Sequence, residues 1–467
     1  MNLDRWKVGA TAREGVVAAS APGGRPRGSA RAAALRAAAL AACVLAAGCV
    51  GAQPKPPEPG LGPAAVPASA PSPGPAADSL RVYLMTFGPG ADVWEHFGHT
   101  ALWIHDPVRG TDQAYNYGMF DFNQAHFFRR FIEGKMLYWM QGFDARLFAN
   151  AYIQEDRSIW VQELALTPAQ REALREFLVW NEQPENRFYP YDYYRDGCAT
   201  RVRDALDRLL GGRIYAETAR LPSGSTYRSH SLELVEDDPW AYTGLLLGLG
   251  RPTDRPISLW EEMFLPLELQ QTLRRVTVPT ADGRTVPLVA SERTLYASTR
   301  PAEPGTPPER TWKYALIGLA IATVLAGLAE LARRARVARR ERSAGARLVR
   351  TALALTAGAW SFLSGLLGAL LIFLWAFTAH VTSQNNANVL QMDILALPLV
   401  VLLPAALFGA RWAARPARLL AAAIAALSLL GLLLEATPWF WQVNAGIIAL
   451  ALPTNLALAW AAHRATD

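Results

Sequence analysis

The chain has 467 residues, of which 51% are hydrophobic, and a formal net charge of +6. This length exceeds that of one compact domain. The basic residues gather near the N-terminus and in short loops between apolar segments, which indicates membrane topology and argues against a nucleic-acid-binding surface. Two of the three cysteines, Cys43 and Cys49, lie in an N-terminal leader, so a disulfide within the rest of the chain is excluded.

Residues 1–50 have the order of an export signal, because arginines precede an apolar run at 37–47. The run ends at Cys49 in a segment that resembles the lipobox of bacterial lipoproteins, although Ala46 stands where a branched residue is usual. Lipidation of Cys49, plain cleavage and an uncleaved anchor all stay open. Residues 51–79 are rich in Pro and Ala, so we expect an extended, disordered linker.

Residues 80–310 show the patterns of an α+β domain. Their β-branched and aromatic content predicts strands at 80–87, 100–104 and 113–117. Helical spacing follows at 123–133 and 167–182, where Thr167 before Pro168 predicts an N-cap with proline at the first helical position.

Residues 311–467 are predicted to form a helical membrane domain of about five transmembrane helices. Five apolar runs are long enough, or nearly so, to span hydrocarbon, at 314–331, 353–376, 394–408, 419–434 and 445–461. Arginines fill the loops after the first and third runs, whereas the loop at 384–393 carries neither Lys nor Arg. The positive-inside rule makes the Arg-rich loops cytoplasmic. We therefore expect residues 80–310 on the extracytoplasmic, periplasmic side of a bacterial cytoplasmic (inner) membrane.

Cys198 is the candidate nucleophile. A periodic helix is predicted to begin at or near it, and the N–H groups of a helix start, together with a nearby imidazole, lower a thiol pKa from roughly 8.5. The sequence therefore predicts a reactive thiolate. The alternative is a small buried hydrophobic residue, against which the flanking charges Arg195, Asp196 and Arg201 argue.

His99 is the expected base, because the alternating residues that follow it fix the direction of its side chain. His96 is the competitor, and we expect it in a loop beside the substrate. Asn116 is the expected third residue, which would orient the imidazole, although a strand-end asparagine is equally compatible with the pattern. His96, His99, His105 and Asp106 are close in sequence, but strand alternation would send them to different faces and no metal-binding spacing accompanies them, so we expect no metal and no other cofactor.

Three blocks resemble the signatures of the Lnb-type family: residues 97–102 (FGHTAL), 116–122 (NYGMFDF) and 196–201 (DGCATR). The family that these blocks resemble is that of the lipoprotein intramolecular transacylases. It is similar in turn to permuted papain-like or NlpC/P60 thiol enzymes, in which the histidine strand precedes the cysteine helix. That order occurs here. The resemblance covers most of residues 80–300 and implies a papain-like, permuted NlpC/P60-type fold.

The resemblance also implies a chemistry. Cys198 would take an acyl chain as a thioester, while His99 acts first as base and then as acid. The chain would move from the glycerol of a diacylated lipoprotein to the α-amino group of the same lipid-bearing cysteine. The family tends to have Asn immediately before the cysteine, whereas this chain has Gly197, so any hydrogen bond from that side chain is missing.

The expected partner is a membrane lipid or lipoprotein. Expected substrate-binding residues, besides His96, are the tyrosines Tyr117, Tyr191 and Tyr194, together with His380 and Asn386 in a segment weakly similar to the family's His-then-Asn-x-Asn segment. A polar loop that only closes a helical hairpin is the alternative for that segment. Two other functions stay open: a cell-envelope cysteine peptidase or amidase of the NlpC/P60 type, and a non-catalytic envelope module.

Overall fold

The computed structural model describes residues 79–280, 282–300, 309–338, 343–437 and 440–466. The leader, the three possible fates of Cys49 and almost all of the expected linker lie outside these residues. The described chain divides into two compact units. The first takes residues 79–238 and 256–300, and the second takes 239–255 and 309–466.

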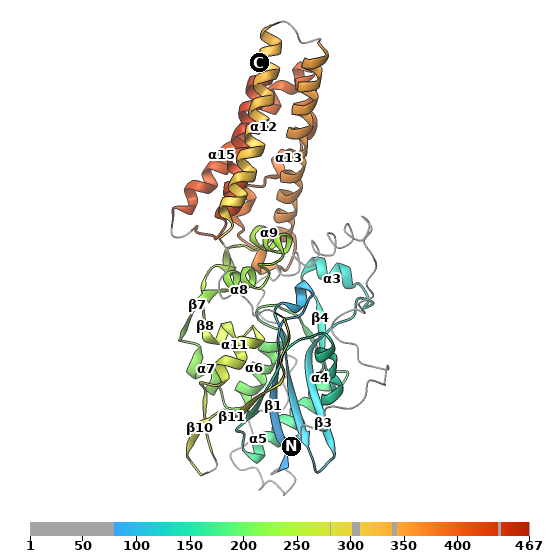
Figure 1. Ribbon diagram of the computed structural model, residues 1–467, viewed down its shortest axis with the longest axis vertical. Helices are drawn as coiled ribbons and strands as arrows, with labels where there is room; N and C mark the ends of the chain where they lie inside the picture. The colour runs from blue at the N-terminus through green and yellow to red at the C-terminus, as the bar shows by residue number, and fades with distance from the viewer. Residues whose placement is uncertain (1–78, 281, 301–308, 339–342, 438–439, 467) are drawn as a thin grey trace. The chain divides into compact units, whose positions relative to one another are not determined.

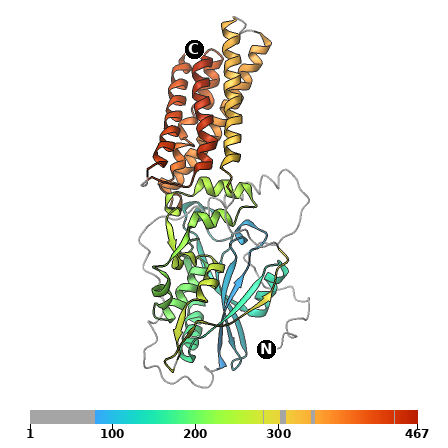
Figure 2. The same cartoon turned by 60° about the vertical axis from the view of Figure 1, so that its left-hand side comes forward.

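The first unit is built on a seven-stranded antiparallel sheet (Figures 1 and 2). Its strand order is β11-β5-β1-β2-β3-β4-β6. The strands are β1 Arg81–Phe87, β2 His99–Asp106, β3 Thr111–Met119, β4 Leu137–Asp144, β5 Ile159–Leu164, β6 Phe188–Pro190 and β11 Val289–Tyr296. The three predicted strands are confirmed, and two of them extend beyond their predicted ends.

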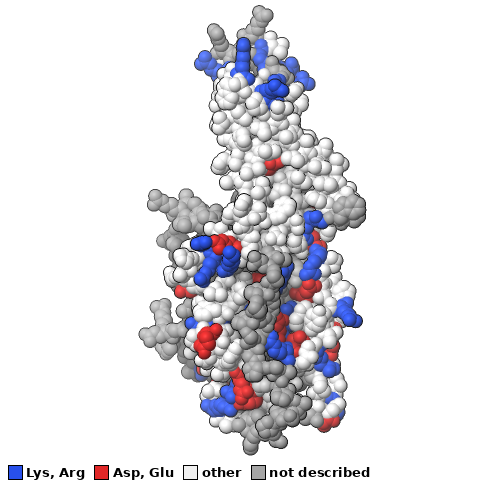
Figure 3. Space-filling view, turned by 180° about the vertical axis from the view of Figure 1, so that it is seen from behind, with Lys and Arg blue, Asp and Glu red and all other residues white. Residues whose placement is uncertain are grey.

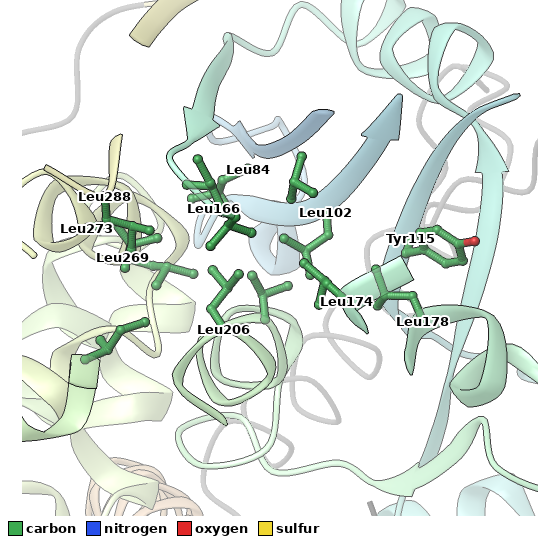
Figure 4. Packing of buried hydrophobic residues seen from close by; sticks show 14 of the residues in the cluster. Leu84, Leu102, Tyr115, Leu166, Leu174, Leu178, Leu206, Leu269, Leu273 and Leu288 are labelled. Atoms are coloured by element: carbon green, nitrogen blue, oxygen red, sulfur yellow. The ribbon is translucent and has the colours of Figure 1, made fainter. Parts of the chain in front are cut away.

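Both faces of the sheet are covered. Three helices pack on one face of the sheet and form a leucine-rich core with it: α5 (Pro168–Glu182), α6 (Cys198–Leu209) and α11 (Pro266–Leu273) (Figure 4). Helix α4 (Ala145–Gln154) packs on the opposite face. Successive strand residues point to opposite faces, so Leu102 joins the first core and Trp103 the second. Because both faces of the sheet are covered, the four residues 101–104 in the middle of β2 are all apolar and buried.

The predicted N-cap of α5 is confirmed. The Thr167 side chain accepts a hydrogen bond from the N–H of Gln170, and Pro168 is the first helical residue. The helix predicted at 123–133 begins later, as α3 (Phe127–Glu133), because Asp121 accepts the N–H of Asn123 and holds the preceding residues in turns. The remaining elements of this unit are η2 Val93–Glu95, α7 Arg213–Thr218, β7 Pro222–Thr226, α8 Tyr227–Glu233, β8 Pro256–Ser258, α10 Leu259–Glu262, β9 Thr277–Pro279 and β10 Thr285–Pro287.

The second unit is helical. Four of its described helices are long and apolar enough to cross a membrane: α12 Thr311–Val337, α13 Ala344–Phe377, α15 Arg411–Glu435 and α16 Ala445–Thr466. The predicted third span is instead a pair of short elements, η6 Ile394–Ala396 and α14 Leu399–Leu407, which pass the same test only together with Val381–Leu390, across a bend of 47°. The count of five spans therefore holds only if this bent pair is one span.

Charge is distributed unevenly over the helical unit. Figure 3 shows Lys and Arg gathered at the end where α12 stops and α13 starts, next to a band that is almost free of charge. The guanidinium of Arg336, near the end of α12, donates to the backbone carbonyls of Arg464 and Ala465 at the end of α16. The helix ends that carry arginine therefore meet at one end of the unit, as the positive-inside rule requires.

The segment between α13 and α14 is not an exposed polar loop. His380 is 1% exposed, and Asn386 and Asn388 are fully buried. The amide of Asn386 donates to the carbonyls of Leu247 and Gly248, at the end of α9 (Pro239–Gly248). This contact satisfies helix-end carbonyls that would otherwise lack partners. Asn386 thus fixes α9 within the second unit, and the expected contact of His380 and Asn386 with lipid stays a prediction.

Candidate active site

Cys198 is the first residue of α6, which confirms the predicted helix start. A tight turn precedes it, because Asp192 and Asp196 exchange two backbone hydrogen bonds. The Asp192 carboxylate also accepts the N–H groups of Tyr194 and Arg195, which lie between them. Thr200 closes the helix start by accepting the N–H of Gly197 at 2.8 Å. The flanking charges serve this local structure, since Arg201 pairs with Asp196.

His99 and Asn116 lie side by side on neighbouring strands. His99 opens β2, Asn116 lies within β3, and the Nε2 of His99 is 2.5 Å from the Oδ1 of Asn116. The Nδ2 of Asn116 donates to the sulfur of Met119 at 3.2 Å, so the carbonyl side of the amide faces the ring. Nε2 therefore carries the ring proton and donates it to Asn116, which leaves Nδ1 as the free base.

Gly118 brings the cysteine and the histidine together. It has a φ of +105°, and a Cβ placed on it would lie 3.6 Å from the Cε1 of His99 and 3.8 Å from the Cβ of Cys198. Both side chains therefore border the same small space above Gly118. A register shift between Tyr117 and Met119 accompanies this backbone conformation. The sequence signal was a glycine inside a strand pattern, which marks a bulge or a close approach.

The resting charges differ from the expectation. Burial raises the pKa of the Cys198 thiol to about 11, although the backbone N–H groups of Thr100 and Ala199 hydrogen-bond to the sulfur and lower it. Burial also lowers the pKa of His99 to about 4, against the opposing effect of its hydrogen bond with Asn116. Burial therefore favours a neutral thiol beside a neutral imidazole, and it opposes the resting thiolate that the sequence predicts.

A buried arginine that the sequence did not reveal lies behind the histidine. Arg157 is 4% exposed, donates to the carbonyl of Gly88 at 2.9 Å and places its guanidinium 4.7 Å from the ring centre of Tyr152. The Tyr152 ring lies nearly parallel to the imidazole of His99, at 6.0 Å between centres. Arg157 lowers the pKa of both His99 and Cys198 through its charge, after the larger effect of burial.

Three of the expected substrate-binding residues have structural partners. Tyr117 is 1% exposed and donates to Asn181 at 2.7 Å, while Tyr194 is 3% exposed and shares a hydrogen bond with Ser231. The Nδ1 of His96 donates to the carbonyl of Leu234 at 2.8 Å. These contacts explain why the three residues are present, and their contact with substrate stays a prediction.

Tyr191 lies beside the nucleophile. A Cβ placed on Gly197, the residue before Cys198, would be 3.7 Å from the Cε2 of Tyr191. The Tyr191 ring stacks on that of Tyr138, with 4.1 Å between the ring centres and 18° between the planes. Of the four expected substrate-binding residues in this unit, Tyr191 is thus the one that the structure brings next to the cysteine.

The residues of this site lie in a part of the chain that matches a known protein family. Residues 75–231 match the family model of the Lnb N-terminal periplasmic domain. This domain belongs to the Lnb family. Cys198, His99 and Asn116 all lie within the matched residues, whereas His380 and Asn386 lie beyond them. No curated protein and no solved structure matches the chain. With the apolar helices of the second unit, the match identifies a membrane-associated protein with a periplasmic domain.

Proposed function

We propose that the Lnb domain is a thiol acyltransferase that moves lipid-linked acyl groups through a thioester on Cys198. One arrangement carries this proposal: a cysteine at a helix start and a histidine with a free Nδ1 border the same space above Gly118. A nucleophile, a base and a group that orients the base are what acyl transfer through a covalent intermediate needs.

In the first half-reaction, the thiol proton of Cys198 passes to Nδ1 of His99 while the sulfur attacks the ester carbonyl of the donor. The tetrahedral intermediate collapses when the bond to the glycerol oxygen breaks, and His99 returns the proton to that oxygen. In the second half-reaction, an amine attacks the thioester, loses a proton to His99, and displaces the sulfur, which regains a proton. Asn116 holds Nε2–H throughout, so it is a positioning residue.

The resting neutral pair fits this sequence of steps. A buried thiolate would be costly before substrate arrives, whereas proton transfer during attack creates the charge only when it is used. The N–H groups of Thr100 and Ala199, which already point to the sulfur, would stabilise the negative charge that develops there.

The proposed donor is a lipid-linked acyl group, because the domain belongs to a chain with four or five apolar helices that can cross a membrane. We propose N-acylation of a lipoprotein, with transfer from the lipoprotein's own glycerol to its α-amino group. Transfer from a separate phospholipid uses the same two half-reactions. The two routes differ in product, because intramolecular transfer leaves the number of chains unchanged and intermolecular transfer adds one.

The test is tandem mass spectrometry of lipoprotein N-termini from cells with the wild-type chain, Cys198→Ala or Ser223→Ala. The last variant is a matched control, because it also removes one heavy atom from a side chain of intermediate exposure, in β7 and outside the site. We expect an N-acylated cysteine in the wild type and the control, and a free α-amino group in Cys198→Ala. Unchanged lipoproteins with altered cell-wall fragments would contradict acyl transfer and indicate an amidase.

A further inference from the structure

Helix α3 exposes its apolar side chains. Its sequence is FFRRFIE, yet none of its seven residues is buried. Phe128 is 71% exposed and Ile132 is 52% exposed, and Phe122 in the preceding turn is 56% exposed. Single exposed apolar residues are ordinary, but three large ones on one short segment form a patch that normally contacts a partner or a membrane.

The patch continues inward as a row of aromatic rings. Phe122 and Phe127 have ring centres 5.1 Å apart, and Phe120 lies 5.1 Å from Phe122. Phe120 stacks on Tyr138 at 5.2 Å, with 22° between the planes. Tyr138 in turn stacks on Tyr191, which borders Gly197 and the nucleophile. An aromatic row therefore connects the exposed patch with Cys198.

This row differs from an aromatic core. Phe120, Phe127, Tyr138 and Tyr191 are all partly exposed, and the row ends on exposed rings. The same unit holds a second aromatic cluster whose central rings, Tyr194, Tyr227 and Phe264, are only 3 to 5% exposed, with Phe97 and Tyr193 partly buried at its edge. Burial of apolar surface accounts for that second cluster. The rings of the first cluster stay partly exposed to solvent along the whole row, which adds little to the stability of the fold.

The surroundings of the patch fit a lipid surface. Residues 120–135 carry the bases Arg129, Arg130 and Lys135 against two acids, so the segment is net basic and complements anionic headgroups. Aromatic and aliphatic side chains beside Lys and Arg are typical of segments that lie in the interface of a bilayer. The apolar helices of the same chain tether the domain to a bilayer, so weak insertion suffices.

We propose that the aromatic row is the path of the acyl chain. Phe122, Phe128 and Ile132 insert into the outer leaflet, and a lipid acyl chain lies along Phe120, Tyr138 and Tyr191 with its carbonyl at Cys198. The stacked rings present a continuous row of apolar edges against which methylene groups pack. This inference rests on the proposed acyltransferase function, because it assigns the occupant of the row as the chain to be transferred.

The first experiment tests the path without catalysis. The full-length Cys198→Ala protein is reconstituted in phosphatidylethanolamine–phosphatidylglycerol vesicles that contain a phospholipid with a diazirine in its acyl chain, and cross-linked peptides are mapped by mass spectrometry. We expect adducts within residues 120–132 and on Tyr138 or Tyr191. Tyr215 and Leu221, which are 54% and 50% exposed on the same unit, are the comparison sites. Equal labelling at those sites, or no labelling in the row, would overturn the proposal.

The second experiment separates access from chemistry. In the double variant Phe122→Ser/Phe128→Ser, we expect acylation of Cys198 from a vesicle-embedded diacylated lipopeptide with a blocked α-amino group to slow by about tenfold or more, because two large side chains no longer anchor the patch in the interface. Acylation from a water-soluble short-chain thioester should not change. The double variant Tyr215→Ser/Leu221→Ser should behave as wild type with both donors. Equal loss with both donors would overturn the path.

These outcomes are distinct from a failure of the proposed function. If the wild type acylates Cys198 neither from the diacylated lipopeptide nor from the short-chain thioester, the thioester mechanism fails, and the cross-linking map alone then decides whether lipid chains occupy the row. If the wild type acylates Cys198 and the map is empty at 120–138, the mechanism stands and the path is wrong.

Discussion

The reactivity of Cys198 as a function of pH tests the inferred neutral pair. Because burial raises the thiol pKa to about 11, the thiolate fraction in the substrate-free protein is about one in a thousand at pH 8. Alkylation by iodoacetamide requires the thiolate, so the rate should rise about tenfold for each pH unit between pH 6 and 9. The assay is timed alkylation of the full-length protein, quantified by mass spectrometry on the peptide that contains Cys198.

A thiolate–imidazolium pair would give a different profile. Its alkylation rate would be high and nearly constant over several pH units, and would fall only when the thiolate is protonated at low pH. A plateau below pH 7 would refute the neutral pair and restore the resting thiolate. The His99→Ala variant is the control. If the imidazole is neutral across this range, its removal should leave the slope of the alkylation rate unchanged. If Cys198 and His99 instead form an ion pair, its removal should abolish the plateau.

Three further predictions concern two neighbours of the pair, Asn116 and Gly118, and His99 itself. Asn116→Ala should lower kcat for thioester formation by about a hundredfold with little change in KM, because the imidazole loses its orienting partner; a pure KM effect would contradict this role. Gly118→Ala should lower the free energy of unfolding by about 1–2 kcal/mol, measured by denaturant titration, because a side chain is strained at φ +105°; an unchanged stability would contradict the strain. The pKa of His99 is lowered to about 4, so the unfolded chain binds a proton near pH 6.5 that the folded protein refuses until about pH 4. The stability from this group is complete above pH 6.5 and lost as the pH falls to 4, by about 3 kcal/mol, and His99→Gln should abolish that part of the acid sensitivity.

Local features of the fold could be predicted from the sequence. The strand at 80–87, the cap at Thr167 and the helix start at Cys198 depend on residues close in the chain, and the structure confirms all three. The partnership of His99 and Asn116 also followed from chain order, because consecutive antiparallel strands usually pair side by side.

Features that depend on distant residues could not be predicted. The pairing of β11 with β5 joins segments more than a hundred residues apart, and no local pattern at β11 specifies that partner. The burial of Arg157 behind Tyr152 is likewise set by packing alone. The resting thiolate was expected because a helix start is visible in the sequence, whereas the desolvation that opposes it depends on the complete surroundings of Cys198.

The membrane half shows the same division. Hydropathy located the apolar runs, because length and composition determine whether a helix can span. It did not reveal the bend before α14, nor that Asn386 and Asn388 turn inward to the end of α9. Buried amides of this kind are specified by the carbonyls they satisfy, which lie some 140 residues away in the chain.

The central claim is that Cys198 carries the acyl group. The most direct measurement is peptide mass spectrometry of the full-length protein after incubation with vesicles that contain a diacylated lipopeptide whose α-amino group is blocked, so that no amine can accept the chain. The account predicts that the peptide with Cys198 gains the mass of one acyl chain, that neutral hydroxylamine removes it, and that Cys198→Ala gains nothing. Transfer of acyl chains to an added acceptor without any label on Cys198, or a stable label on another residue, would contradict it.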